Sequence, residues 1–78
     1  MKRNDLIDIY QAENGCEYIV EEVPENSLLA SLGIYKNSIV KKNYRYKFGG
    51  PVVMRVSSRD IAVGKDVAQD IKVRKVAH

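Results

Sequence analysis

The sequence is poor in the residues that stabilise secreted proteins or carry catalysis: its 78 residues include one cysteine, one histidine, two prolines and no tryptophan. The lone Cys16 cannot form an intramolecular disulfide, which excludes a small disulfide-stabilised secreted scaffold. The N-terminus has no apolar signal-peptide core, and no run approaches the ~20 apolar residues of a membrane-spanning helix. We therefore expect a cytoplasmic protein without membrane insertion.

The residue combinations used in catalysis and metal binding are also missing. The only histidine is the last residue, His78, so no serine or cysteine has a partner for triad chemistry. Cys16, His78 and the scattered carboxylates show no CxxC or HxxxH spacing. Gly49 and Gly50 lack the Lys-Ser/Thr that follows a phosphate-binding loop. We expect no enzymatic activity, no metal site and no cofactor.

The length bounds the architecture. With 78 residues the chain can build one hydrophobic core, so residues 1–78 are predicted to form a single domain. A domain this small buries only about 60% of the surface that its unfolded chain exposes, which leaves few apolar residues to line a deep pocket. The hydrophobic fraction of 45% and the charged fraction of 29% are those of an ordinary globular protein.

The charge is distributed unevenly. The formal net charge is +3, and the segment from Lys36 to Lys47 holds five bases and no acid. Such a segment is suited to nucleic acid, a phospholipid surface or an acidic protein patch. On a chain of this size it is more often the solvated face of a strand.

Five segments have the composition and alternation of short strands. They are residues 16–23, 39–46, 51–57, 60–63 and 71–76. The second, third and fourth are joined by hairpin-sized connections. In the first segment Val23 breaks the alternation, and a bulge near Glu21 and Glu22 would return Val23 to the inner face.

A short helix is predicted over residues 26–33, between the first and second of these strands. Leu28 and Leu29 lie on its apolar face, and Gly33 supplies the left-handed residue that ends it. Ile34 is expected to pack back onto the last helical turn. A second segment, residues 65–70, makes one helical turn.

Two turns depend on residues that tolerate a positive φ. Asn37, just before the second strand, is of the residue type that tolerates it best after glycine. Gly49 and Gly50 lie where the chain reverses between two strands, and we expect both to use that freedom. Pro51 suits the first residue of the following strand, where no ladder hydrogen bond is needed from it.

These elements together define a fold class. Five short strands, with one short helix between the first two, favour a mainly β fold over any helical one. In a chain this small, the arrangement expected is an SH3-like, partly open β-barrel.

The joint spacing of the apolar and glycine positions resembles the FeoA family. The matching residues are Leu32-Gly33-Ile34, Val40, Gly49-Gly50-Pro51-Val52, Met54-Arg55-Val56, Ile61-Ala62-Val63, Ala68, Ile71 and Val73, with Asn4-Asp5-Leu6 resembling the lead-in to the first strand. The resemblance implies an accessory factor in the bacterial cytoplasm that associates with FeoB, the large membrane GTPase that moves Fe(II). The same barrel resembles the C-terminal domain of iron-dependent repressors of the diphtheria toxin repressor type.

Two residues depart from the family's pattern. Asn37 stands where the family usually has glycine, and left-handed geometry remains accessible to it. Lys42 stands where the family usually has an apolar strand residue. Either its aliphatic stem runs along the rim of the barrel to reach water, or the strand register differs near this point.

The most unusual local feature is the run of aromatic and basic residues at 44–48, because a short hairpin cannot bury all of them. Tyrosine and arginine are enriched where partners bind. We expect this hairpin and the helix with its cap to form the docking surface for FeoB, through Leu28, Leu29, Tyr35, Lys36, Tyr44, Arg45, Tyr46, Lys47 and Phe48. The alternative is nucleic-acid binding through the same hairpin. The simplest interpretation is that these residues only cover one end of the barrel.

Overall fold

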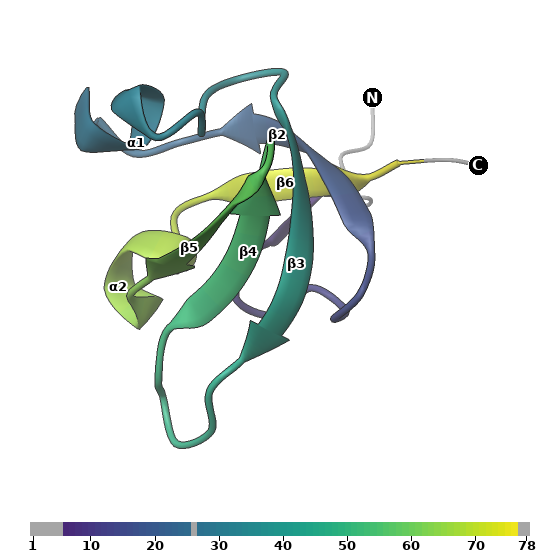
Figure 1. Ribbon diagram of the computed structural model, residues 1–78, viewed down its shortest axis with the longest axis vertical. Coiled ribbons are helices and arrows are strands. Elements are labelled where there is room, and N and C mark those ends of the chain that lie inside the picture. The colour runs from purple at the N-terminus through teal and green to yellow at the C-terminus, as the bar shows by residue number, and fades with distance from the viewer. Residues whose placement is uncertain (1–5, 26, 77–78) are drawn as a thin grey trace.

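One antiparallel sheet forms the body of the computed structural model, which describes residues 6–25 and 27–76 (Figure 1). The strands are β1 (Leu6–Asp8), β2 (Glu17–Glu22), β3 (Ile39–Arg45), β4 (Val52–Val56), β5 (Arg59–Val63) and β6 (Lys72–Lys75). They are ordered β1-β6-β2-β3-β4-β5, so the sheet is open, with β1 and β5 at its edges. Two short helices, α1 (Ser27–Ser31) and α2 (Lys65–Ala68), complete the fold. The predicted mainly β class is confirmed.

The predicted strand count of five is wrong, because β1 is a further strand. With three residues it is too short to show an alternation pattern, and it forms by pairing antiparallel with β6, Leu6 opposite Arg74. The helix therefore lies between the second and third strands instead of the first two. The predicted features that involve Asn4, Asp5, Asn26 and His78 lie outside the described residues.

The core is built from alternate strand residues, as in β4, where Val52, Met54 and Val56 are buried and Arg55 is exposed. Figure 1 shows that the sheet is curved. The other buried apolar residues are Ile9, Tyr10, Ala12, Tyr18, Val20, Leu29, Ile34, Val40, Val63, Ala68, Ile71 and Val73. No helix in the described part of the chain is long and apolar enough to cross a membrane.

Two strands carry a register shift that changes which face a side chain occupies. In β2 the shift falls between Val20 and Glu22, which confirms the predicted bulge. The prediction for Val23 is wrong, because Val23 remains exposed after the bulge. In β3 the shift falls between Lys42 and Tyr44. Lys42 pairs with Met54, whereas Tyr44, two residues later, pairs with Val53, only one residue back along β4.

The end of α1 has the predicted glycine cap. Gly33 has a φ of +93°, the N–H of Ile34 donates to the carbonyl of Leu29 at 2.9 Å, and the N–H of Gly33 donates to the carbonyl of Ala30 at 3.0 Å. This is the Schellman pattern, in which Ile34 packs back on the helix. A Cβ added at Gly33 would lie 2.8 Å from Cγ1 of Val56, so the cap also lets α1 approach β4 closely.

Asn37 and Gly49 have positive φ values of 77°, as predicted. The same prediction for Gly50 is wrong, because the φ of Gly50 is not positive. Glycine is needed at this position for a steric reason: a Cβ there would lie 2.5 Å from Cβ of Tyr46. The second positive φ of this turn belongs instead to Phe48, at 60°. Pro51 directly precedes β4, and its carbonyl accepts a hydrogen bond from the N–H of Tyr46 at 2.9 Å.

Lys42 occupies a core position in β3 and is 2% exposed. Its Nζ donates hydrogen bonds to the carbonyl oxygens of Tyr10 at 2.7 Å and Ala12 at 2.5 Å. The main chain of the same lysine bonds to the loop as well, through the carbonyl of Cys16 at 3.0 Å and the N–H of Gly15 at 2.6 Å. The side chain of Lys42 therefore does not run along the rim of the barrel, and the predicted strand register is correct at Lys42 itself. Its role is to bond the 9–16 loop to the sheet.

The Gly33 cap leads to a first prediction. Gly33→Ala is expected to cost about 1–3 kcal/mol of unfolding free energy, because alanine would be strained at this φ and its methyl group would collide with Val56. Gly15→Ala is the matched control, since Gly15 has a φ of +80° but open space around it. Urea unfolding of both variants checks this. An equal loss in the two variants would show that the contact with Val56 is unimportant.

The buried ammonium leads to a second prediction. Burial lowers the pKa of Lys42 from its ordinary 10.5, and the nearby Arg45 lowers it further. Between the lowered folded-state pKa and 10.5 the unfolded chain binds more protons, so the wild type gains stability there as pH rises. Lys42→Met leaves two carbonyls without a donor and is expected to cost about 1–3 kcal/mol at neutral pH.

The stability difference between wild type and Lys42→Met should therefore grow as the pH rises toward 10.5. Urea unfolding of both proteins across a pH series measures it, and titrations common to both proteins cancel in the difference. A difference that shrinks with rising pH would contradict the assigned burial of the charge.

Candidate functional site

The predicted docking residues fall into two groups at opposite ends of β3 (Figure 1). Leu28, Tyr35 and Lys36 lie in α1 and in the turn before β3, whereas residues 44–48 lie at its other end. A strand advances about 3.4 Å per residue, so the seven residues of β3 separate the groups by roughly 20 Å. Leu29 was predicted as a docking residue, but it is 4% exposed and belongs to the core.

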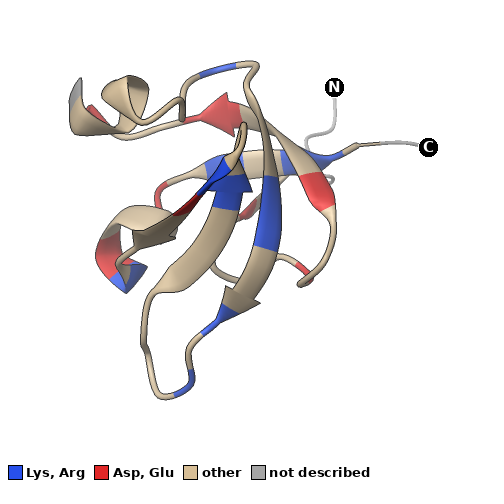
Figure 2. Cartoon of the chain, viewed as in Figure 1, with Lys and Arg blue, Asp and Glu red and all other residues tan. Residues whose placement is uncertain are grey.

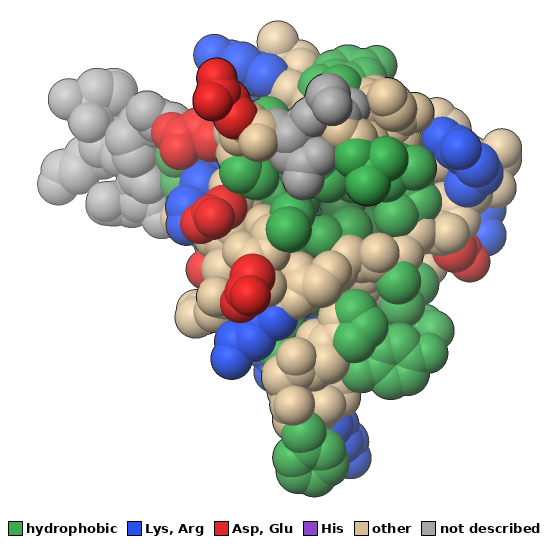
Figure 3. Space-filling model, turned by 90° about the vertical axis from the view of Figure 1, so that its left-hand side faces the viewer, with side chains coloured by type: hydrophobic (Ala, Val, Ile, Leu, Met, Phe, Trp, Pro, Cys, Tyr) green, Lys and Arg blue, Asp and Glu red, His purple; other side chains and the backbone are tan. Residues whose placement is uncertain are grey.

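The first group extends into an apolar surface that we call the α1 patch, defined as Val23, Leu28, Tyr35 and Ile39. All four are exposed; Leu28 is the most open, at 62%. Figure 3 shows hydrophobic side chains gathered around α1 in the upper part of this face. Ile39 was not among the predicted docking residues, although its position next to the buried Val40 on an alternating strand was a signal that it points outward.

The turn that follows α1 is held by its own polar groups. The hydroxyl of Ser38 donates to the carbonyl of Tyr35 at 2.7 Å and accepts the N–H of Tyr35 at 3.1 Å. The N–H of Asn37 donates to the carbonyl of Val20 at 2.7 Å. Tyr35 of the α1 patch is therefore held in a turn bonded directly to the sheet.

The second group forms what we call the hairpin tip, residues 44–50 between β3 and β4. After the bulge in β3, Tyr44 and Tyr46 share the outer face of the strand, and their rings meet edge to face with centroids 5.3 Å apart. Phe48 is fully exposed at the turn, where the N–H of Gly50 donates to the carbonyl of Lys47 at 3.3 Å. The expectation that aromatic surface stays exposed on this hairpin is confirmed.

Arg45 turns to the other side and supports the loop that Lys42 holds. Its Cζ lies 4.6 Å from the centroid of the Tyr10 ring, and its Nη1 donates to the carbonyl of Tyr10 at 3.4 Å. Lys42 and Arg45, two of the five bases between residues 36 and 47, are thus bonded to the 9–16 loop. In Figure 2 the remaining bases of this segment lie at separate positions along the chain: before β3, within β3 and in the hairpin.

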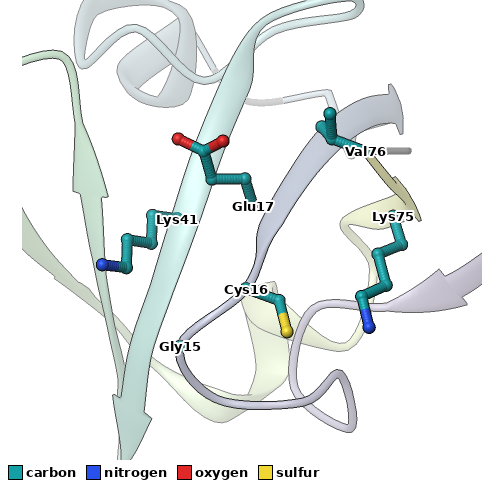
Figure 4. Close-up of a pocket in the computed structure, with 6 residues that line it drawn as sticks. All are labelled: Gly15, Cys16, Glu17, Lys41, Lys75 and Val76. Carbon is teal, nitrogen blue, oxygen red and sulfur yellow. The ribbon is translucent and has the colours of Figure 1, made fainter. Parts of the chain in front are cut away.

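A shallow pocket of about 310 Å³ lies beside the single cysteine (Figure 4). Sγ of Cys16 is 3.9 Å from a carboxylate oxygen of Glu13 that also accepts a hydrogen bond from Nζ of Lys75 at 3.0 Å. This hydrogen bond lowers the pKa of Glu13. Lys41 lines the pocket but points away in Figure 4. The described residues contain no group of three metal-ligating side chains.

Comparison with solved structures shows which fold this chain adopts. A crystal structure of an iron uptake regulatory protein, FeoA, is 22% identical, with a TM-score of 0.81 over 91% of this chain and 97% of that one. The NMR structure of a FeoA-like protein from Clostridium acetobutylicum is 21% identical, with a TM-score of 0.77 over 100% and 93%. The chain therefore shares the small SH3-like fold of these proteins.

Residues 7–75 match the family model of the FeoA domain. The chain belongs to the FeoA family. It also superposes on ScaR with bound Cd²⁺, a repressor of which it spans 35%, with 20% identity and a TM-score of 0.80. A comparison with curated protein sequences gave no match.

The tyrosine pair leads to a third prediction. Hydrogen bonding to Tyr46 raises the pKa of Tyr44 above its ordinary 10.0, and the charge of Asp60 adds to the effect. Tyr46→Phe removes the hydrogen-bond partner, so the pKa of Tyr44 should fall toward 10.0. NMR titration with ¹³C-labelled tyrosine measures it, with Tyr35→Phe as the control. An unchanged Tyr44 titration would show that the two hydroxyls do not interact in solution.

Proposed function

We propose that this protein is an accessory factor of bacterial ferrous iron uptake that acts in the cytoplasm by docking on the membrane GTPase transporter FeoB. The observation that carries the proposal is the family match over residues 7–75. The related FeoA structures, similar over nearly their full lengths, support the same role. The role is one of binding and regulation.

The α1 patch is the better of the two ends for a protein partner. Protein interfaces have an apolar, well-packed centre with a polar rim, and lysine is depleted from that centre. The α1 patch offers aliphatic side chains and one tyrosine, with Lys36 at its margin. Because Tyr35 lies in a turn bonded to β2 and Ile39 lies in β3, little ordering of these two residues is needed when a partner binds.

Nucleic-acid binding is supported less well. It was expected to use the bases between residues 36 and 47, but Lys42 is buried and Arg45 stacks on Tyr10. Of the bases that remain, Lys36 precedes β3, Lys41 lies in β3 and Lys47 lies in the hairpin that follows, so they are spread over more than the length of this strand. The likeness to the repressor ScaR covers about a third of that protein and supports only the fold.

The docking proposal leads to a fourth prediction. The double substitution Leu28→Gln and Ile39→Thr removes aliphatic surface from the α1 patch while keeping residues suited to helix and strand. We expect at least about tenfold weaker binding to detergent-solubilised FeoB under reducing conditions with Fe(II) and a guanine nucleotide present. Calorimetry or surface plasmon resonance measures it.

Ile7→Thr is the matched control, because Ile7 is exposed on the edge strand β1 and should leave binding unchanged. Absence of binding by the wild type would overturn the proposed function. Binding that survives the double substitution would move the contact away from the α1 patch while leaving the proposed function intact.

A further inference from the structure

We propose that the hairpin tip is a lipid-contact site, which seats Phe48 at the boundary between headgroups and acyl chains of an anionic bilayer. This goes beyond docking on a protein partner and does not depend on it. The contact is a shallow one made by a single loop, so it needs no membrane-spanning segment. The expectation that the chain does not insert as a transmembrane protein is unaffected.

The first argument is the shape of the tip. Phe48 is 102% exposed, and Figure 3 shows a hydrophobic side chain projecting at the lower end of the molecule, where the β3–β4 hairpin ends. A projecting ring finds no pocket of its own chain to fill. A fluid interface accepts a convex apolar side chain without a preformed cavity, whereas a protein partner must supply a matching pocket.

The second argument is that the backbone holds Phe48 outward. Phenylalanine is strongly disfavoured at a φ of 60°, so its presence there carries a conformational cost. The turn is braced by the 3.3 Å bond from Gly50 to Lys47 and by the close packing of Gly50 on Tyr46. Such strain persists where the surroundings fix it, and it is characteristic of functional loops.

The third argument is the arrangement of the tyrosines. Tyr44 and Tyr46 lie behind Phe48 on the outer face of the strand, 5.3 Å apart and half exposed. Tyrosine combines an apolar ring with a polar hydroxyl and is enriched at the level of the lipid headgroups. An apolar tip followed by two tyrosines matches the depth profile of a bilayer interface.

The fourth argument is charge. No acidic residue occurs between Glu25 and Asp60, and the tip carries Lys47 beside Phe48. Lys65 of α2 adds a second ammonium at the loop, since its Nζ would lie 3.9 Å from a Cβ at Gly49. Asp60, the acid that acts on Tyr44, is paired with Arg55 at 3.1 Å. Lysines around an apolar tip favour an anionic lipid surface, whereas the centres of protein interfaces are depleted of lysine.

The experiment uses Phe48→Trp, because the chain contains no other tryptophan. The full chain is mixed with protein-free vesicles of phosphatidylcholine alone or of phosphatidylcholine and phosphatidylglycerol in equal parts. The tryptophan emission should shift to the blue with the anionic vesicles and return as salt is raised, since the contact is partly electrostatic. Brominated acyl chains should quench it.

Two further variants separate apolar insertion from simple charge attraction. Phe48→Asn removes the ring and suits the positive φ, so the variant should fold at least as well as wild type. It should bind anionic vesicles about tenfold more weakly in a sedimentation assay. Lys47→Gln should weaken binding to anionic vesicles only. The control Leu28→Gln, at the other end of β3, should bind as wild type does.

Three results would overturn the proposal. The first is that the tryptophan emission of Phe48→Trp does not shift with any vesicle at low salt. The second is that Phe48→Asn sediments with vesicles as wild type does, which would mean that charge attraction alone accounts for binding. The third is a blue shift that appears only when detergent-solubilised FeoB is added, which would assign the tip to a pocket of the protein partner. Because the vesicles contain no protein, the first two outcomes are independent of docking through the α1 patch.

Discussion

The ammonium group of Lys42 lies in the core and bonds the sheet to the 9–16 loop. A lysine in a core position is costly unless its charge is satisfied, and here the carbonyls of Tyr10 and Ala12 satisfy it. These bonds fix the 9–16 loop over one end of the sheet, which places the side chains of Ile9, Tyr10 and Ala12 in the core. Arg45 stacks on the outside of the same loop. A residue that breaks the apolar pattern is thus a structural cross-link between segments about thirty residues apart.

The bulge that follows Lys42 decides what the hairpin presents. In a regular strand, residues two apart share a face, so Tyr44 would point inward with Lys42. The one-residue shift instead turns Tyr44 and Tyr46 outward and brings Arg45 toward Tyr10. A single inserted residue therefore produces both the exposed aromatic tip and the internal support of the loop.

The two exposed surfaces lie at the ends of β3 and differ in chemistry. The α1 patch is largely aliphatic and fits a protein partner, whereas the hairpin tip combines aromatic rings with lysines and fits an anionic lipid surface. The proposed role at a membrane transporter would gain from both kinds of contact, because weak attachment to the bilayer raises the concentration of a docking protein near the transporter.

Features that arise from local patterns were predictable from the amino-acid sequence. Three such features are the alternation in β2 to β4, the glycine cap at Gly33 and the turn at Asn37. Each depends on residues that are neighbours in the sequence, so it could be predicted without a structure. The family resemblance came from the same apolar and glycine positions. Only the tertiary structure decided the remainder. Strand β1 exists through its pairing with β6, and Leu29 is buried while Leu28 is exposed because β4 approaches one side of α1. The carbonyls that accept Lys42 come from a distant loop, and long-range contacts of this kind leave no periodic signal in the chain.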